Sequence, residues 1–242
     1  MCQFLTKSKS SREPAISTII RKQTKDFARL WLLFCDRELL RQTARQLDPS
    51  LYRNHWLFRN KPGVEFYETQ WTTGRHKYPS KLERALLTDN TCMDSVYVTF
   101  VTISQRLLAL PFVQNVEWIT VNPFPRLVLI KEQIIRTEEE IVHEHDCIAI
   151  MARDNSRYVL DLSGWQFGYD DYFFTWEEYK VKCMAPGSPT TVRNPVVENR
   201  RVAERYHEYP RHLERLQHWK HKVTQAGDRK LRRMTRGIKL SL

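Results

Sequence analysis

Two short apolar runs in the second half of the chain, separated by a polar turn, constrain the fold most strongly. The run HDCIAIMA begins at His145 and the run RYVLDL contains Asp161, with Asp154 and Asn155 between the two runs. Asp and Asn tolerate the backbone angles of tight turns, so the pattern predicts an antiparallel hairpin. With the turn centred there, the numbers of opposed residues sum to about 309, which places Asp161 opposite Ile148, three residues along from His145.

A long apolar segment before the hairpin predicts a buried helix. Apolar residues recur at helical spacing from Thr88 to Leu110, capping candidates occur at positions 89–91, and Pro111 follows the segment. These signals are typical of the beginning and end of a helix, although the β-branched residues of VYVTFVTI would also suit a strand. The helix interpretation places Cys92 in the first turn of a core helix.

Two further apolar runs, at 112–121 and 126–135, predict strands that complete a sheet with the hairpin. The sequence therefore predicts an α+β fold. In this fold, a core helix carrying the cysteine packs on an antiparallel sheet carrying His145 and Asp161, and a basic helical extension follows at the C-terminus.

Composition divides the chain into four parts. Residues 1–14 are polar and basic and predict a disordered lead-in, and residues 15–185 form the α+β domain, with an amphipathic helix from Thr24 to Leu47. Pro and Gly residues indicate a linker at 186–193, and residues 194–242 predict a basic helical tail.

Positive charge is concentrated in that tail. The formal net charge of the chain is +11, and residues 194–242 contain thirteen Lys and Arg against five Asp and Glu. Such side chains can contact phosphates, so nucleic acid is a candidate partner. The same charge could instead be a basic surface in contact with solvent only, or it could bind an anionic membrane surface or an acidic protein. No zinc-finger or RNP motif accompanies it. The candidate anion-binding residues are Arg229, Lys230, Arg232, Arg233 and Arg236.

The cysteines indicate free thiols rather than cross-links. There are five, an odd number, widely spaced and without a CxxC pair, so the sequence predicts neither a disulfide framework nor a zinc ribbon. No apolar run approaches the roughly 20 residues of a membrane-spanning helix. We therefore expect an intracellular protein, cytoplasmic or nuclear, that uses no cofactor. The sequence leaves its oligomeric state open.

Alternating histidine and cysteine residues raise one metal hypothesis. In a strand, His143, His145 and Cys147 would all face one side of the sheet, and this spacing can support a metal site. The sequence shows no fourth ligand for such a site, so we predict no metal.

Cys92, His145 and Asp161 together suggest a nucleophile, a base and an orienting group. A cysteine attacks as the thiolate, and the N-terminus of a helix beside a histidine favours that charged form. The same helix N–H groups can stabilise the oxyanion that develops when a thiolate attacks an amide or thioester carbonyl. His145 would take and return the proton, with His143 as an alternative base, while Asp161 would fix the imidazole tautomer.

A cysteine on a helix, followed by a histidine on a strand and an aspartate on the next strand, resembles the papain and transglutaminase-like superfamily in its transglutaminase chain order. The resemblance covers roughly residues 85–170. The string DLSGWQFG is also similar to a segment of uncharacterised fungal proteins of this kind. Thr91 and Met93, which flank Cys92, depart from the family pattern, because the family often has Gly or Trp beside its nucleophile.

This resemblance implies cysteine-dependent acyl transfer or amide hydrolysis on a protein substrate, as in a protease, deamidase or transglutaminase. The oxyanion helper of the family would correspond to Gln70, Asn90 or Gln166, among which the sequence does not choose. The alternative is a noncatalytic papain-like scaffold that binds a protein or nucleic acid through its cleft or its basic tail. In that case the three triad residues would have only structural roles.

Overall fold

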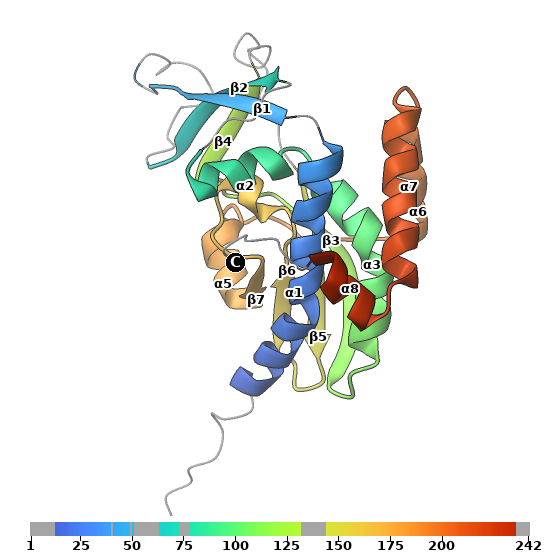
Figure 1. The fold of residues 1–242 in the computed structure, drawn as a ribbon. Helices are drawn as coiled ribbons and strands as arrows, with labels where there is room; N and C mark the ends of the chain where they lie inside the picture. Colours follow the sequence, from blue (N-terminus) through green and yellow to red (C-terminus); the bar gives the residue numbers. More distant parts are fainter. Residues whose placement is uncertain are drawn as a thin grey trace, which may run out of the picture.

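The structure is a computed structural model that describes residues 13–39, 41–48, 50, 63–72, 78–131 and 144–235. Within these ranges it contains seven α-helices, a short 3₁₀-helix and two β-sheets, which confirms the predicted α+β class (Figure 1). The helices are α1 (Glu13–Glu38), α2 (Ser80–Thr88), α3 (Cys92–Leu108), α5 (Trp176–Cys183), α6 (Pro195–Arg205), α7 (Pro210–Gln225), α8 (Asp228–Thr235) and the 3₁₀-helix η2 (Gly164–Phe167). The strands are β1 (Arg41–Gln46), β2 (Glu65–Thr72), β3 (Val113–Val121), β4 (Leu127–Lys131), β5 (His145–Ala152), β6 (Arg157–Leu160), β7 (Phe173–Thr175) and β8 (Thr191–Arg193).

The larger sheet is antiparallel and has the strand order β7–β6–β5–β3–β8. Side chains alternate between the two faces of a strand, so each face has its own packing partners. One face, which includes Trp118, Ile148 and Leu160, packs with α1, α3 and α7 in the main hydrophobic core. The other face, which includes Cys147 and Val159, packs against α5. The sheet is therefore buried on both sides.

The predicted hairpin is present, but its register is one residue away from the prediction. Ile148 lies opposite Leu160 rather than Asp161. The turn is a three-residue loop closed by the bond from the Ala152 N–H to the Ser156 carbonyl, with a left-handed residue at position 155. Because a one-residue slip moves each side chain to the other face, the predicted register was wrong in a consequential way.

The observed register explains how the hairpin brings two distant residues together. Continued by one residue beyond β6, it sets Asp161 beside Cys147. Cys147 is two residues from His145, and residues two apart in a strand share a face. Asp161 and His145 therefore lie on the same face of the sheet, the one that packs against α5.

Helix α3 begins at Cys92, close to the predicted boundary, and packs on β3 and β5. Its residues Val96, Phe100 and Ile103 are buried in the main core. The helix forms although VYVTFVTI would suit a strand on propensity alone, because burial of an apolar face outweighs a weak local preference.

The N-terminal helix differs from the prediction. It spans Glu13–Glu38 instead of Thr24–Leu47, and Arg41–Gln46 form β1. This strand is an edge of the smaller sheet, whose order is β1–β2–β4, with β1–β2 antiparallel and β2–β4 parallel (Figure 1). Pairing with β2 is a tertiary interaction that the polar sequence RQTARQ does not reveal locally.

Residues 194–235, the described part of the predicted basic tail, belong to the body of the protein. Helices α6, α7 and α8 are present, but their apolar residues Val202, Leu216, Trp219 and Val223 are buried in the main core. Helix α7 packs on α3, and α8 packs on α1. The basic residues are therefore the outer faces of amphipathic helices. None of the described helices is long and apolar enough to cross a membrane.

Candidate active site

His145 and Asp161 form a fully buried pair at one end of the larger sheet. Nε2 of His145 lies 2.8 Å from Oδ2 of Asp161. The hydroxyl of Tyr179 donates to the same oxygen at 2.9 Å, and the Ser163 N–H donates to Oδ1 at 3.3 Å. An ionised carboxylate only accepts hydrogen bonds, so Nε2 carries a proton whether the ring is charged or neutral, and Nδ1 is the acceptor when the ring is neutral. Asp161 thereby sets both the ring orientation and the tautomer.

The second ring nitrogen is available to the cysteine. Nδ1 of His145 is buried and makes no aligned hydrogen bond with a described residue. The side chain of Cys92 is a neighbour of the imidazole and helps to raise the pKa of His145. The same thiol approaches the carbonyl oxygen of Glu144 at 4.0 Å. The described contacts thus run from a carboxylate through an imidazole to a thiol.

The environment of His145 favours its charged form. Burial alone would lower the pKa of His145, but the charge and hydrogen bond of Asp161, aided by Cys92, outweigh burial and raise the pKa to about 10. A cationic imidazole beside a thiol stabilises the thiolate. Three other cysteines lack such a partner, and burial raises the pKa of the thiols of Cys35, Cys147 and Cys183.

Cys92 is the first residue of a 17-residue helix whose N-terminus has no side-chain cap. The N-cap residue is Thr91, and its hydroxyl donates instead to the Thr88 carbonyl at 2.8 Å. The N–H groups of the first turn of a helix have no partner within the helix, and here no side chain of the N-cap occupies them. Negative charge is stabilised at such a helix N-terminus, which is where Cys92 lies.

Gln166 carries a buried donor close to this helix N-terminus. Its Oε1 accepts the Asn90 N–H at 2.9 Å, two residues before Cys92. Its amide nitrogen is buried and has no partner among the described residues. Buried donors are seldom left without a partner, so this nitrogen is suited to bind an incoming acceptor. Of the three oxyanion candidates from the sequence, Gln166 has the best placement.

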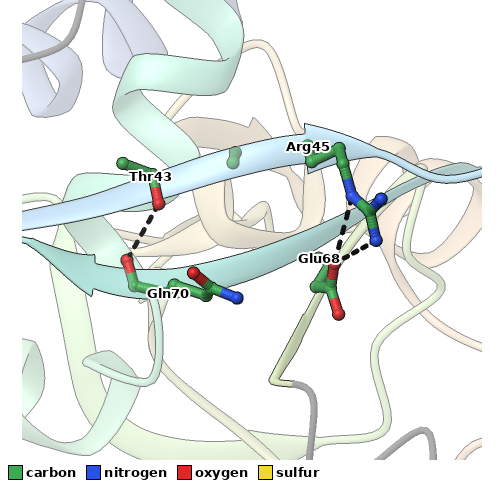
Figure 2. Close-up of a pocket in the computed structure, with 5 residues that line it drawn as sticks. Thr43, Arg45, Glu68 and Gln70 are labelled. Carbon is green, nitrogen blue, oxygen red and sulfur yellow. Dashed lines mark hydrogen bonds and ion pairs between the residues drawn. The ribbon is translucent and has the colours of Figure 1, made fainter.

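The other two candidates are placed less favourably. The side chain of Asn90 accepts a hydrogen bond from Arg205 at 3.0 Å. Gln70 lies in β2 and lines a surface pocket of about 440 Å³ on the smaller sheet, where its backbone carbonyl accepts from the Thr43 hydroxyl (Figure 2). Arg45 and Glu68 form an ion pair in the same pocket. Among the described residues, no contact joins Gln70 to Cys92.

Gly164 permits the close approach of the backbone to the carboxylate. A Cβ atom at this position would lie 2.5 Å from Oδ2 of Asp161 and 2.8 Å from Cδ2 of Tyr169. Both neighbours are buried, and Asp161 cannot move without losing its hydrogen bonds to His145 and Tyr179. This explains why a glycine is required in the segment SGWQFG.

We therefore expect Gly164→Ala to lower the free energy of unfolding by about 1–3 kcal/mol, because the site is overpacked. The alkylation rate of Cys92 at neutral pH should fall as well, since Asp161 is displaced. Urea unfolding and mass spectrometry of alkylated peptides measure the two effects. Gly227→Ala is the matched control, because a Cβ at Gly227 meets no atom within 4 Å; an equal loss in both variants would contradict the explanation.

The remaining predicted sites give a mixed result. His143 lies outside the described residues, within which no group of three His, Cys, Asp or Glu is arranged to hold a metal ion. The basic group Arg229, Lys230, Arg232 and Arg233 belongs to α8, while Arg236 lies outside the described residues. Lys230 and Arg233 are exposed, and Leu231 between them is buried against the core.

Several residues that position the side chains and the helix of the site were not predicted from the sequence. Tyr179 follows Trp176 at helical spacing, which signals an inward-facing residue but not a bond to Asp161. Asp94 in the first turn of α3 accepts from Tyr206 at 2.8 Å and from His212 at 3.2 Å. No local pattern connects these C-terminal residues to α3, because the contacts span more than a hundred residues of chain.

Comparisons of the chain with models of protein families, with curated proteins and with solved structures found no significant match. The function of the chain is therefore inferred from its own residues, and above all from Cys92, His145 and Asp161.

Proposed function

We propose that this protein is a cysteine-dependent enzyme that performs acyl transfer or amide hydrolysis on a protein substrate. The observation that carries the proposal is the buried hydrogen bond between Nε2 of His145 and Asp161, together with the neighbouring thiol of Cys92, which begins α3 and helps to raise the pKa of the same imidazole. A nucleophile needs a base within reach, and the base needs an orienting group. The resemblance to the papain and transglutaminase-like superfamily points to the same chemistry.

Each residue has a defined part in the proposed reaction. His145 accepts the proton of Cys92 at Nδ1, and the thiolate attacks the carbonyl carbon of the substrate. The oxyanion is stabilised by N–H groups of the first turn of α3 and by the Gln166 amide. The imidazolium then protonates the departing amine, which leaves a thioester on Cys92. Water or a second amine, deprotonated by His145, resolves the thioester and regenerates the thiol.

The burial of the site limits the substrate. Cys92 is 9% exposed, and His145 is not exposed at all. A substrate must therefore bring its acyl group to the thiol on an extended backbone or on a flexible side chain. Both are features of protein substrates, such as an unfolded segment or a glutamine side chain.

Alkylation by iodoacetamide as a function of pH tests the proposal. Peptide mass spectrometry follows Cys92 together with Cys35, Cys147 and Cys183, the buried thiols that serve as internal controls. We expect Cys92 to react at neutral pH and below, and His145→Ala to remove this reactivity. If Cys92 reacts no faster than the three controls, the noncatalytic scaffold becomes the better explanation.

Replacement of Gln166 by alanine should separate oxyanion stabilisation from thiol reactivity. We expect acylation of Cys92 by p-nitrophenyl acetate to slow by about 10²–10³-fold, the usual loss for one oxyanion donor. Alkylation by iodoacetamide should persist, because displacement at a saturated carbon forms no oxyanion. Gln70→Ala is the control and should change neither rate. If Gln166→Ala slows both reactions equally, Gln166 shapes the site and does not bind the oxyanion.

A further inference from the structure

The end of α6 is attached directly to the segment that carries the nucleophile. Nη2 of Arg205 donates to Oδ1 of Asn90 at 3.0 Å. Asn90 is two residues before Cys92, so their Cα atoms are within about 7 Å of each other. The next residue, Tyr206, donates to the buried carboxylate of Asp94 at 2.8 Å. The bond of Arg205 to Asn90 and the bond of Tyr206 to Asp94 therefore hold Arg205 close to the start of α3, where the candidate nucleophile lies.

The arginines around this site differ in how their charges are compensated. Arg193 and Arg201 both pair with the carboxylate of Glu144, at 2.7 and 3.8 Å, and Arg201 also pairs with Glu198. Arg205 forms no ion pair with an acidic residue of the described chain. Its hydrogen bond is to a neutral amide, and its guanidinium lies over the ring of Tyr206 at 5.6 Å. The charge of Arg205 is thus positioned and exposed, and it has no anionic partner among the described residues.

We propose that Arg205 recognises a substrate carboxylate, that of an aspartate or glutamate next to the acyl group that Cys92 attacks. The guanidinium group is planar and matches the geometry of a carboxylate, which makes arginine the side chain of choice for such recognition. The proposal rests on the proposed function, because it assigns the substrate of that same site. It makes Arg205 a specificity-determining residue and not part of the bond-breaking machinery.

Two alkylating probes that differ in one group test this selection. N-iodoacetyl-glutamate α-amide carries a side-chain carboxylate, and N-iodoacetyl-glutamine α-amide carries a neutral carboxamide in its place. The ratio of their rates at Cys92 is compared with the ratio for 2-mercaptoethanol. Because both probes react with the same thiolate, a change in thiolate fraction cancels in the ratio. We expect the full-length protein to favour the acidic probe by about fivefold, the effect of one charge pair near a solvated surface.

Substitution of the arginine should remove that preference. In Arg205→Gln the ratio should fall to that of 2-mercaptoethanol, whereas Arg205→Lys should retain part of it. Arg153→Gln is the matched control, because Arg153 is exposed and lies about 26 Å away along β5 from His145. It removes the same charge and should leave the ratio unchanged.

The outcomes separate the two proposals. A ratio for the unmodified protein that equals the model thiol ratio, or one that survives Arg205→Gln, overturns the role of Arg205 while Cys92 remains a reactive nucleophile. An equal loss in Arg153→Gln would also overturn it, since net charge alone would then explain the preference. If Cys92 reacts with neither probe, the proposed function itself fails.

Discussion

Replacing Cys92 with alanine will abolish acylation by p-nitrophenyl acetate, with a fall in rate of at least about 10⁴-fold. The reason is that no other described thiol combines an imidazole neighbour with a helix N-terminus. The substitution removes one sulfur atom from a residue that is 9% exposed, so the free energy of unfolding should change by about 1 kcal/mol. Stopped-flow release of p-nitrophenolate and urea unfolding measure the two quantities.

Cys147→Ala is the matched control for this prediction. Cys147 is fully buried on the same strand as His145, two residues away, and burial raises the pKa of its thiol. The control should retain acylation at nearly the unmodified rate, although its cost in stability should be similar. Acylation that persists in Cys92→Ala, or that disappears in Cys147→Ala, would show that the nucleophile has been assigned to the wrong residue.

Replacing Asp161 with asparagine should have the largest effect on stability. The carboxylate is fully buried and holds the imidazolium of His145 at 2.8 Å. Asparagine has nearly the same shape but no charge, so the variant leaves a buried cation without its counter-charge. Breaking a buried ion pair in this way costs about 3–5 kcal/mol. We expect that loss in the free energy of unfolding at pH 7, together with loss of Cys92 alkylation at neutral pH.

The pH dependence of stability identifies the cause of that loss. The pKa of His145 is raised from 6.5 to about 10 by Asp161 and Cys92, although burial opposes the change. The resulting stabilisation is fully present below pH 6.5 and is lost as the pH rises through 10, because only the folded state retains the proton in between. Urea unfolding between pH 6 and 10 should show this decline in the unmodified protein, and Asp161→Asn should lack it.

Comparing the unmodified protein with Asp161→Asn isolates the contribution of His145 to the pH dependence from that of the other titrating groups. The buried thiols, whose pKa values are also raised, contribute a decline of the same sign at alkaline pH in both proteins, so they cancel. Tyr179→Phe is the structural control, because it removes a hydrogen bond from a neutral hydroxyl to the same carboxylate and should cost about 1.5–3 kcal/mol without changing the slope. A slope that survives in Asp161→Asn would mean that another group causes it.

Much of the site could be predicted because its chemistry is local in sequence. The cap and apolar spacing around Cys92 indicated the beginning of a core helix, and α3 begins there. The polar turn between two apolar runs indicated the hairpin that carries His145 and Asp161. The predicted register differed from the observed one by one residue, because the register depends on whether the loop contains two or three residues.

The features that were missed arise from long-range pairing. RQTARQ carries no strand signal, and it becomes β1 only because β2 provides a partner for its backbone. The C-terminal helices appear to be a separate basic extension when only their charge is considered. Their few apolar residues, such as Trp219, complete the core against α1 and α3, which no local pattern reveals.

The sequence by itself determined the fold class, the helix start at Cys92 and the hairpin, because these follow from the periodicity of apolar residues and from turn chemistry. Only the tertiary structure decided that Nε2 of His145 meets Asp161, that the Gln166 amide nitrogen has no partner among the described residues, and that Arg205 is bonded to Asn90, two residues before Cys92. These contacts join segments far apart in the chain, and their geometry is set by packing of the whole core, which sequence spacing does not encode.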